Sequence, residues 1–136
     1  MSAPVEALRN VPLFAGLEER DLEQLAKQMH ERRFPEGSEV TREGSTGAGF
    51  FVIAEGNAEV TIGGEHRATL GRGDHFGEIA LIGDRVRTAT VTAETDLQTL
   101  VTTVWEFRSF VKSNPDAAWK LLEHVVGLLQ EALASR

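Results

Sequence analysis

One acidic and one basic residue stand out in a glycine-rich stretch, GDHFGEIALIGDRVRTAT, which runs from Gly73 to Thr90. Glu78 directly follows a glycine, and Arg87 comes nine positions later. A guanidinium binds two phosphate oxygens at once in a planar fork. A carboxylate repels a phosphate, but it accepts hydrogen bonds from a sugar hydroxyl. The pair therefore predicts a ligand with a phosphate at one edge and a hydroxyl at another, such as a ribose phosphate.

The residues around this pair favour a compact loop. Gly77 permits unusual backbone dihedrals and a close approach of a ligand to the main chain. Residues 78–81 are expected to form one short helical turn, whose free N–H groups attract an anion. Arg87 is expected to open the next strand and return to the same place. Each residue alone also has an ordinary structural role: Glu78 suits a helix N-terminus, and the β-branched Thr88 suits a strand.

The stretch FGEIALIGDRVRTATV resembles the phosphate-binding cassette of the cyclic nucleotide-binding domains. These domains occur in the regulatory subunits of cyclic-AMP-dependent kinase, in cyclic-nucleotide-gated channels and in the bacterial catabolite activator protein. The family pattern is Phe-Gly-Glu-(Leu/Ile)-Ala-Leu, a short spacer, and Arg-(Ala/Thr/Ser)-Ala, which residues 76–81 and 87–89 match. The resemblance covers nearly the whole chain, because NVPLFAGL resembles the family's entry segment and FPEGSEVTREGSTGAGFFVIAEGNAEV its glycine-marked early strands.

The resemblance implies a role for each matching residue. Glu78 would bind the ribose 2′-hydroxyl, Arg87 the cyclic phosphate, and the backbone N–H of Ala89 would lie near that phosphate. A hydroxyl at Thr88 is often associated with cyclic GMP, but some cyclic-AMP binders also have threonine, so the preferred nucleotide stays open. Val86 departs from the proline that the family often has, which would loosen the loop without removing a ligand contact. The expected ligand-binding residues are Phe76, Gly77, Glu78, Ile79, Ala80, Arg87, Thr88 and Ala89.

Short strands are expected to position these residues. From Arg33 to Phe76 the sequence alternates short apolar runs with glycine turns. FFVIAEGNAEVTI predicts a hairpin turned at residues 55–57. RTATVTAETDLQTLVTTV predicts two further strands, broken near residues 94–96. Together they predict an α+β fold, mainly β: an antiparallel jelly-roll barrel with flanking N-terminal helices and a long C-terminal lid helix.

Helices are expected at both ends of the chain. Apolar residues at helical spacing from Leu22 to Met29 predict a helix over residues 18–33. TTVWEFRSFVKS predicts a short helix, and Asn114 and Pro115 suit the N-cap and first position of a long one. The apolar stripe of that long helix has two interpretations. It packs on the barrel, or it serves as a movable lid over the nucleotide base or as a contact with a second copy of the chain or an effector protein.

Composition limits the class of protein. The chain has 136 residues, a net charge of −7 and no cysteine. The length predicts one domain over residues 1–136. The negative charge argues against broad nucleic-acid or membrane binding, and no signal peptide or membrane span is expected. A cysteine-free chain fits the cytoplasm. No cofactor or metal is expected, because the four histidines lack the His-x-His pair of cupin-type metal enzymes.

The sequence therefore predicts a sensor of cyclic AMP or cyclic GMP, not an enzyme. The ligand would be bound rather than consumed and would shift the C-terminal helices between two arrangements. The alternative is a protein-interaction barrel that has lost nucleotide binding. Because the chain ends at Arg136, no helix-turn-helix like that of the catabolite-activator regulators is expected within it, and its downstream effector stays open.

Overall fold

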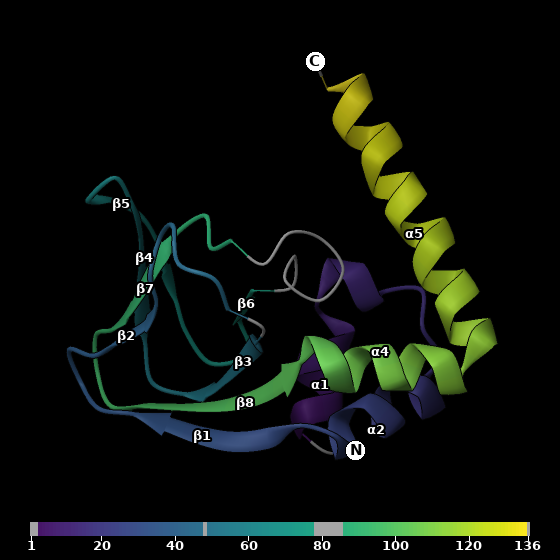
Figure 1. Cartoon of the computed structure of the whole chain (residues 1–136), viewed down its shortest axis with the longest axis horizontal. Helices are drawn as coiled ribbons and strands as arrows, with labels where there is room; N and C mark the ends of the chain where they lie inside the picture. The colour runs from purple at the N-terminus through teal and green to yellow at the C-terminus, as the bar shows by residue number, and fades with distance from the viewer. Residues whose placement is uncertain (1–2, 48, 78–85, 136) are drawn as a thin grey trace.

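Two antiparallel sheets and a set of helices make up the fold in a computed structural model that describes residues 3–47, 49–77 and 86–135 (Figure 1). One sheet has the strand order β1-β8-β3-β6 and the other β2-β7-β4-β5. The strands are β1 (His30–Phe34), β2 (Glu39–Thr41), β3 (Gly49–Glu55), β4 (Ala58–Ile62), β5 (Glu65–Leu70), β6 (His75–Phe76), β7 (Thr90–Ala93) and β8 (Leu97–Thr103). This arrangement confirms the predicted antiparallel, mainly β fold.

The turn at residues 55–57 does not close a hairpin, so that prediction is wrong. β3 pairs with β8 and β6, and β4 pairs with β7 and β5, so the chain changes sheets at Gly56. Because β3 already has a neighbour on each edge, β4 has no place beside it. The predicted break near residues 94–96 is confirmed, and there the chain crosses back from β7 in one sheet to β8 in the other. The two crossings bond to each other, since the Glu94 N–H donates to the Asn57 carbonyl at 2.9 Å.

The helices lie at both ends of the chain, as expected, but their bounds differ from the prediction. They are α1 (Ala3–Arg9), the 3-10 turn η1 (Pro12–Phe14), α2 (Glu19–Lys27), α4 (Val104–Ser113) and α5 (Pro115–Ala134). The helix predicted over residues 18–33 ends at Lys27, because residues 30–34 form β1 and pair with β8. Asn114 takes the predicted N-cap position, but its side chain donates to the Phe110 carbonyl at 2.8 Å instead of capping α5.

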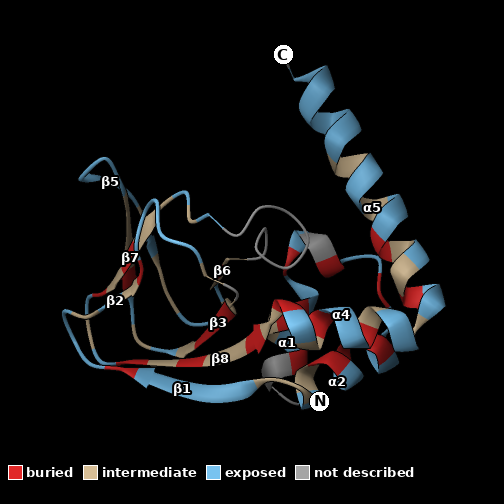
Figure 2. Ribbon diagram, in the orientation of Figure 1, coloured by how far each residue is buried: buried red, intermediate tan, exposed pale blue. Residues whose placement is uncertain are grey.

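Strand β3 connects the helices to the barrel because both of its faces are buried. Phe50 and Val52 face a cluster formed with the helices, whereas Phe51 and Ile53 face a second cluster between the sheets. Phe14 of η1 packs edge-on against Phe50, with ring centroids 5.7 Å apart. Figure 2 shows these buried segments where the helices meet the sheet. The residues of β3 thus belong to both clusters and join the helices to the sheets.

The first half of α5 packs against the other helices, and its second half extends away from the sheets (Figures 1 and 2). Leu121 is buried in the helical cluster, and Lys120 Nζ lies 3.0 Å from Glu18 Oε1. Beyond them Leu128 is half-buried, and five large apolar side chains are exposed: Leu122, Val125, Val126, Leu129 and Leu133. The interpretation that the whole stripe packs on the barrel is therefore wrong. None of the described helices is long and apolar enough to cross a lipid bilayer.

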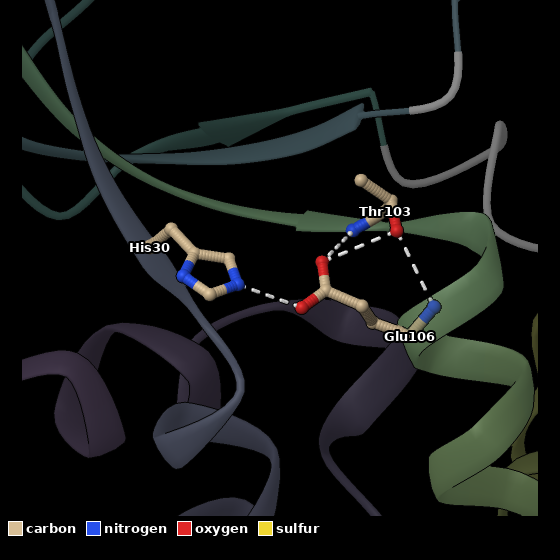
Figure 3. Close-up of polar contacts among 3 residues, drawn as sticks. All are labelled: His30, Thr103 and Glu106. Carbon is tan, nitrogen blue, oxygen red and sulfur yellow. Dashed lines mark hydrogen bonds and ion pairs between the residues drawn. The ribbon is translucent and has the colours of Figure 1, made fainter.

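Glu106 closes the N-terminus of α4 and ties it to β1 (Figure 3). Its Oε1 accepts from the Thr103 N–H at 3.1 Å, and its own N–H donates to Thr103 Oγ1 at 3.3 Å. These reciprocal bonds form a capping box. His30 Nε2 lies 2.8 Å from the other carboxylate oxygen. Partial burial alone would raise the pKa of Glu106, but the bonds from His30 and Thr103 outweigh it and lower the pKa below its ordinary value.

Glu106→Ala is expected to reduce the free energy of unfolding by about 1 kcal/mol near neutral pH, because it removes the carboxylate that accepts from Thr103 in the capping box. A lowered carboxyl pKa stabilises the fold above the unfolded-state value of about 4.3, and this contribution is lost as the pH falls through the folded pKa. Urea unfolding across the acid range measures the effect. Glu106→Gln is the control, because its amide oxygen still accepts from Thr103. A wild-type advantage that persisted unchanged in acid would contradict the assignment.

Candidate functional site

The backbone of Arg87 is held against a segment some forty positions earlier in the chain. Its N–H donates to the Ser45 carbonyl at 2.8 Å, and its carbonyl accepts from the Gly44 N–H at 2.9 Å. The preceding residue, Val86, forms an isolated bridge with Thr46. Arg87 therefore does not open a strand, contrary to the prediction, because β7 begins only at Thr90. The bonds to residues 44–46 nonetheless fix where its side chain starts.

The Arg87 guanidinium lies beside the start of β3, next to Gly47 and the end of β6. Its Nη2 donates to the carbonyl of Gly49 at 2.8 Å, at the start of β3. Its Cζ lies 6.0 Å from the centre of the Phe51 ring, at the outer limit of a cation–π contact. The side chain is half-buried, and this desolvation lowers the pKa of the guanidinium below its ordinary value. An arginine still carries its charge at neutral pH, so the site presents a fixed cation.

Gly77 brings the end of β6 against this guanidinium. Its φ is +87°, which confirms the unusual dihedral expected there and strains any residue with a Cβ. A Cβ at this position would also lie 2.7 Å from the Gly49 carbonyl oxygen and 2.8 Å from Arg87 Nη1. Both the conformation and the close approach therefore require glycine.

Phe76 supports the site from the core. Its ring is buried and stacks on Phe51, with centroids 4.9 Å apart and an interplanar angle of 12°. Phe51 is the ring over which the Arg87 guanidinium lies. Among the described residues, Phe76 thus packs against the Phe51 ring that contacts the Arg87 guanidinium.

The remaining predicted residues lie on either side of Arg87. Thr88 is exposed, and the carbonyl of Ala89 accepts from Thr41 Oγ1 at 3.3 Å. Glu78, Ile79 and Ala80 lie outside the described residues, as does the helical turn predicted over residues 78–81. Their assigned contacts with a sugar or a phosphate stay predictions. The structure thus brings Phe76, Gly77 and Arg87 together, with Ala89 close by along the chain.

Sequence reasoning missed the residues that receive the guanidinium: Gly47, Gly49 and Phe51. They lie in GSTGAGFFV, whose glycines were interpreted only as turns between strands. The closely spaced glycines before an aromatic pair were an available signal of a tight backbone approach. They did not indicate which side chain approaches. Within the described ranges, no three His, Asp or Glu side chains gather where a metal ion could bind.

Comparison with known sequences identifies the protein family of this chain. The profile of the cyclic nucleotide-binding domain matches residues 31–114. The chain belongs to the cyclic nucleotide-binding domain family. Its domain is 41% identical over 93 residues to a cAMP-dependent protein kinase regulatory subunit of Yarrowia lipolytica, covering 67% of this chain and 25% of that protein. It is 35% identical over 108 residues to a cyclic nucleotide-gated potassium channel of Rhizobium etli, covering 79% and 30%.

Solved structures of similar fold agree with this family. The domain superposes on the N-terminal domain of a transcriptional regulator from Streptomyces coelicolor with a TM-score of 0.86 and 27% identity, covering 96% of this chain and 94% of that one. It superposes on the catabolite activator protein of Thermus thermophilus with a TM-score of 0.70 and 26% identity, covering 91% and 61%. The chain spans about a quarter of the length of the curated relatives it matches first.

Proposed function

We propose that this cyclic nucleotide-binding domain is a sensor that binds cyclic AMP or cyclic GMP with the ligand's phosphate on Arg87. The observation that carries the proposal is the half-buried guanidinium, held by the Gly49 carbonyl between the end of β6 and the start of β3. A cation that is already oriented and partly desolvated binds an anion more strongly than a mobile surface arginine does. A cyclic phosphate presents the two oxygens that such a fork requires.

The other residues of the cassette complete the ligand contacts in this proposal. Glu78 accepts a hydrogen bond from the ribose 2′-hydroxyl, and the Ala89 N–H lies near the phosphate. Phe76, Gly77 and residues 79–80 shape the turn between them. Thr88 is exposed beside Arg87 and is the residue in the cassette that could contact the base.

The ligand is bound and not consumed, so the proposed output is a shift between conformations of the C-terminal helices. Arg87 bonds to the first residue of β3, and the next residue, Phe50, packs on Phe14. The Phe14 ring also lies 5.9 Å from that of Phe107 in α4. A ligand that binds one arrangement of the site more tightly favours the arrangement of α4 and α5 that accompanies it.

A direct titration tests the proposal. Nucleotide-stripped protein is titrated calorimetrically with cyclic AMP, cyclic GMP and adenosine, which lacks the phosphate. Tight binding of either cyclic nucleotide, and weak binding of adenosine, supports a phosphate-reading sensor and identifies the preferred base. No binding by a folded, empty protein would contradict the proposal and favour the alternative, a protein-interaction barrel without a ligand.

The proposal also includes a protein partner that binds α5. It further takes residues 1–136 as a single domain that works in the cytoplasm. The exposed apolar residues 122, 125, 126, 129 and 133 recur at i, i+3, i+4, i+7 and i+11, which places them along one helix face. A contiguous exposed apolar face of this kind marks an interaction surface. A second copy of the chain or an effector protein would cover it.

We expect a second copy to cover this face. Wild-type protein should then sediment as a dimer at micromolar concentrations, and the double variant Leu122→Glu, Leu129→Glu as a folded monomer, because the charges would be buried against apolar side chains. Analytical ultracentrifugation measures the difference. The control is Glu131→Gln, an exposed polar change on the same helix. A wild type that stays monomeric would exclude the second copy and leave an effector as the partner.

A further inference from the structure

Gly47 lies beside the Arg87 guanidinium and has no room for a side chain. A Cβ there would lie 2.7 Å from Arg87 Nε and 2.8 Å from Nη2. Unlike Gly77, Gly47 does not have a positive φ, so its backbone is open to any residue type. The requirement for glycine at this position comes from the arginine and not from the turn.

The neighbour that a side chain would meet decides the effect of a substitution. At Gly77 an added Cβ would meet a backbone carbonyl, which cannot move without the strand. At Gly47 the three nearest atoms all belong to the end of the flexible Arg87 side chain. An alanine at position 47 would therefore displace the guanidinium and leave the backbone in place.

We propose that Gly47 is a positioning residue for the ligand phosphate. By lacking a side chain, it lets the guanidinium lie against Gly47 and reach the Gly49 carbonyl with Nη2. That bond fixes the rotation of the planar fork, and a planar fork binds two oxygens only in one orientation. This inference rests on the proposed function, because it assumes that Arg87 binds the phosphate.

Gly47→Ala is expected to weaken cyclic nucleotide binding about 10- to 100-fold, which corresponds to losing one charge-assisted hydrogen bond. The binding of adenosine should stay unchanged, because adenosine has no phosphate for Arg87 to hold. The urea midpoint should stay near that of the wild type, because no backbone atom is displaced. If Gly47 had only a structural role, its substitution would lower the urea midpoint or weaken adenosine binding as well, and not the affinity for cyclic nucleotides alone.

A matched control is Gly16→Ala. Gly16 is an exposed loop glycine without a positive φ, and a Cβ there would make an ordinary contact of 3.6 Å with the Lys120 carbonyl oxygen. This variant adds the same methyl group outside the site. Its affinities for cyclic nucleotides and for adenosine are expected to equal those of the wild type.

Two further measurements isolate the route through Arg87. In the ligand-free protein, the ¹H–¹⁵N resonance of Arg87 Nε should move in Gly47→Ala and stay in place in Gly16→Ala. In an Arg87→Ala background, Gly47→Ala should cause no further loss of affinity, because two residues that act through one contact are not additive.

The outcomes distinguish this inference from the proposed function. An Nε resonance and an affinity that both stay unchanged in Gly47→Ala would overturn the positioning role. An equal loss of affinity in the Arg87→Ala background would also overturn it, because the effect would then bypass Arg87. If the wild type binds no cyclic nucleotide, the proposed function fails, whereas the Nε resonance of the ligand-free protein still reports whether Gly47 places the guanidinium.

Discussion

Arg87→Ala is expected to weaken cyclic nucleotide binding by about a hundredfold to several thousandfold. Each hydrogen bond from a charged group contributes roughly 1.5–3 kcal/mol, and a fork makes two. A loss of about 3–5 kcal/mol corresponds to that change in affinity. The guanidinium is half-buried, and burial disfavours its charge, which offsets part of the stabilisation from its bond to Gly49, so its removal should lower the stability of the fold less than the affinity. Calorimetric titration and urea unfolding measure the two effects separately.

Two further variants make this test specific. Arg67→Ala removes an exposed arginine from β5, in the other sheet, and should bind as the wild type does. Arg87→Lys keeps the charge but loses the planar fork, so its affinity should fall between those of the wild type and the alanine variant. If Arg87→Ala bound cyclic nucleotides as tightly as the wild type, the phosphate would lie elsewhere and the proposed site would be wrong.

Phe14→Ala is expected to lower the free energy of unfolding by about 3–5 kcal/mol, as is typical when a fully buried phenylalanine is truncated. The Phe14 side chain is 0% exposed. Its ring packs on Phe50 of β3 and Phe107 of α4, so one side chain joins the N-terminal turn, the sheet and the C-terminal helices. Small domains have a total stability of only about 5–15 kcal/mol. The loss is therefore a large part of the total stability expected of such a domain.

Urea unfolding followed by circular dichroism measures this loss. Phe14→Leu should cost less, because it keeps most of the apolar volume. Trp119→Ala removes a larger aromatic ring that is 62% exposed and should change stability by no more than about 0.5 kcal/mol. A loss below about 1 kcal/mol in Phe14→Ala would show that the helices and the sheet hold together without this ring.

Local signals in the sequence were sufficient for much of the fold. Short apolar runs between glycines predicted the strands, and the pair Asn114-Pro115 predicted where α5 begins. TTVWEFRSFVKS predicted the short helix that the structure places at Val104–Ser113. These features succeed because a cap or a turn is decided by residues within a few positions of each other. The cassette pattern likewise indicated Arg87 as a candidate ligand-binding residue, which stays a prediction.

Pairing between distant segments was decided only in the tertiary structure. The sequence of β3 and β4 predicts strands but not which strands pair. The two strands lie in different sheets, so the predicted hairpin was wrong. The helix of α2 stopped at Lys27 because the backbone of β1 pairs with β8, about seventy positions later. The sequence by itself indicated Arg87 as the candidate residue for binding a phosphate. Only the fold decided that Gly47, Gly49 and Phe51 hold its guanidinium, because contacts across forty positions leave no periodic signal in the chain.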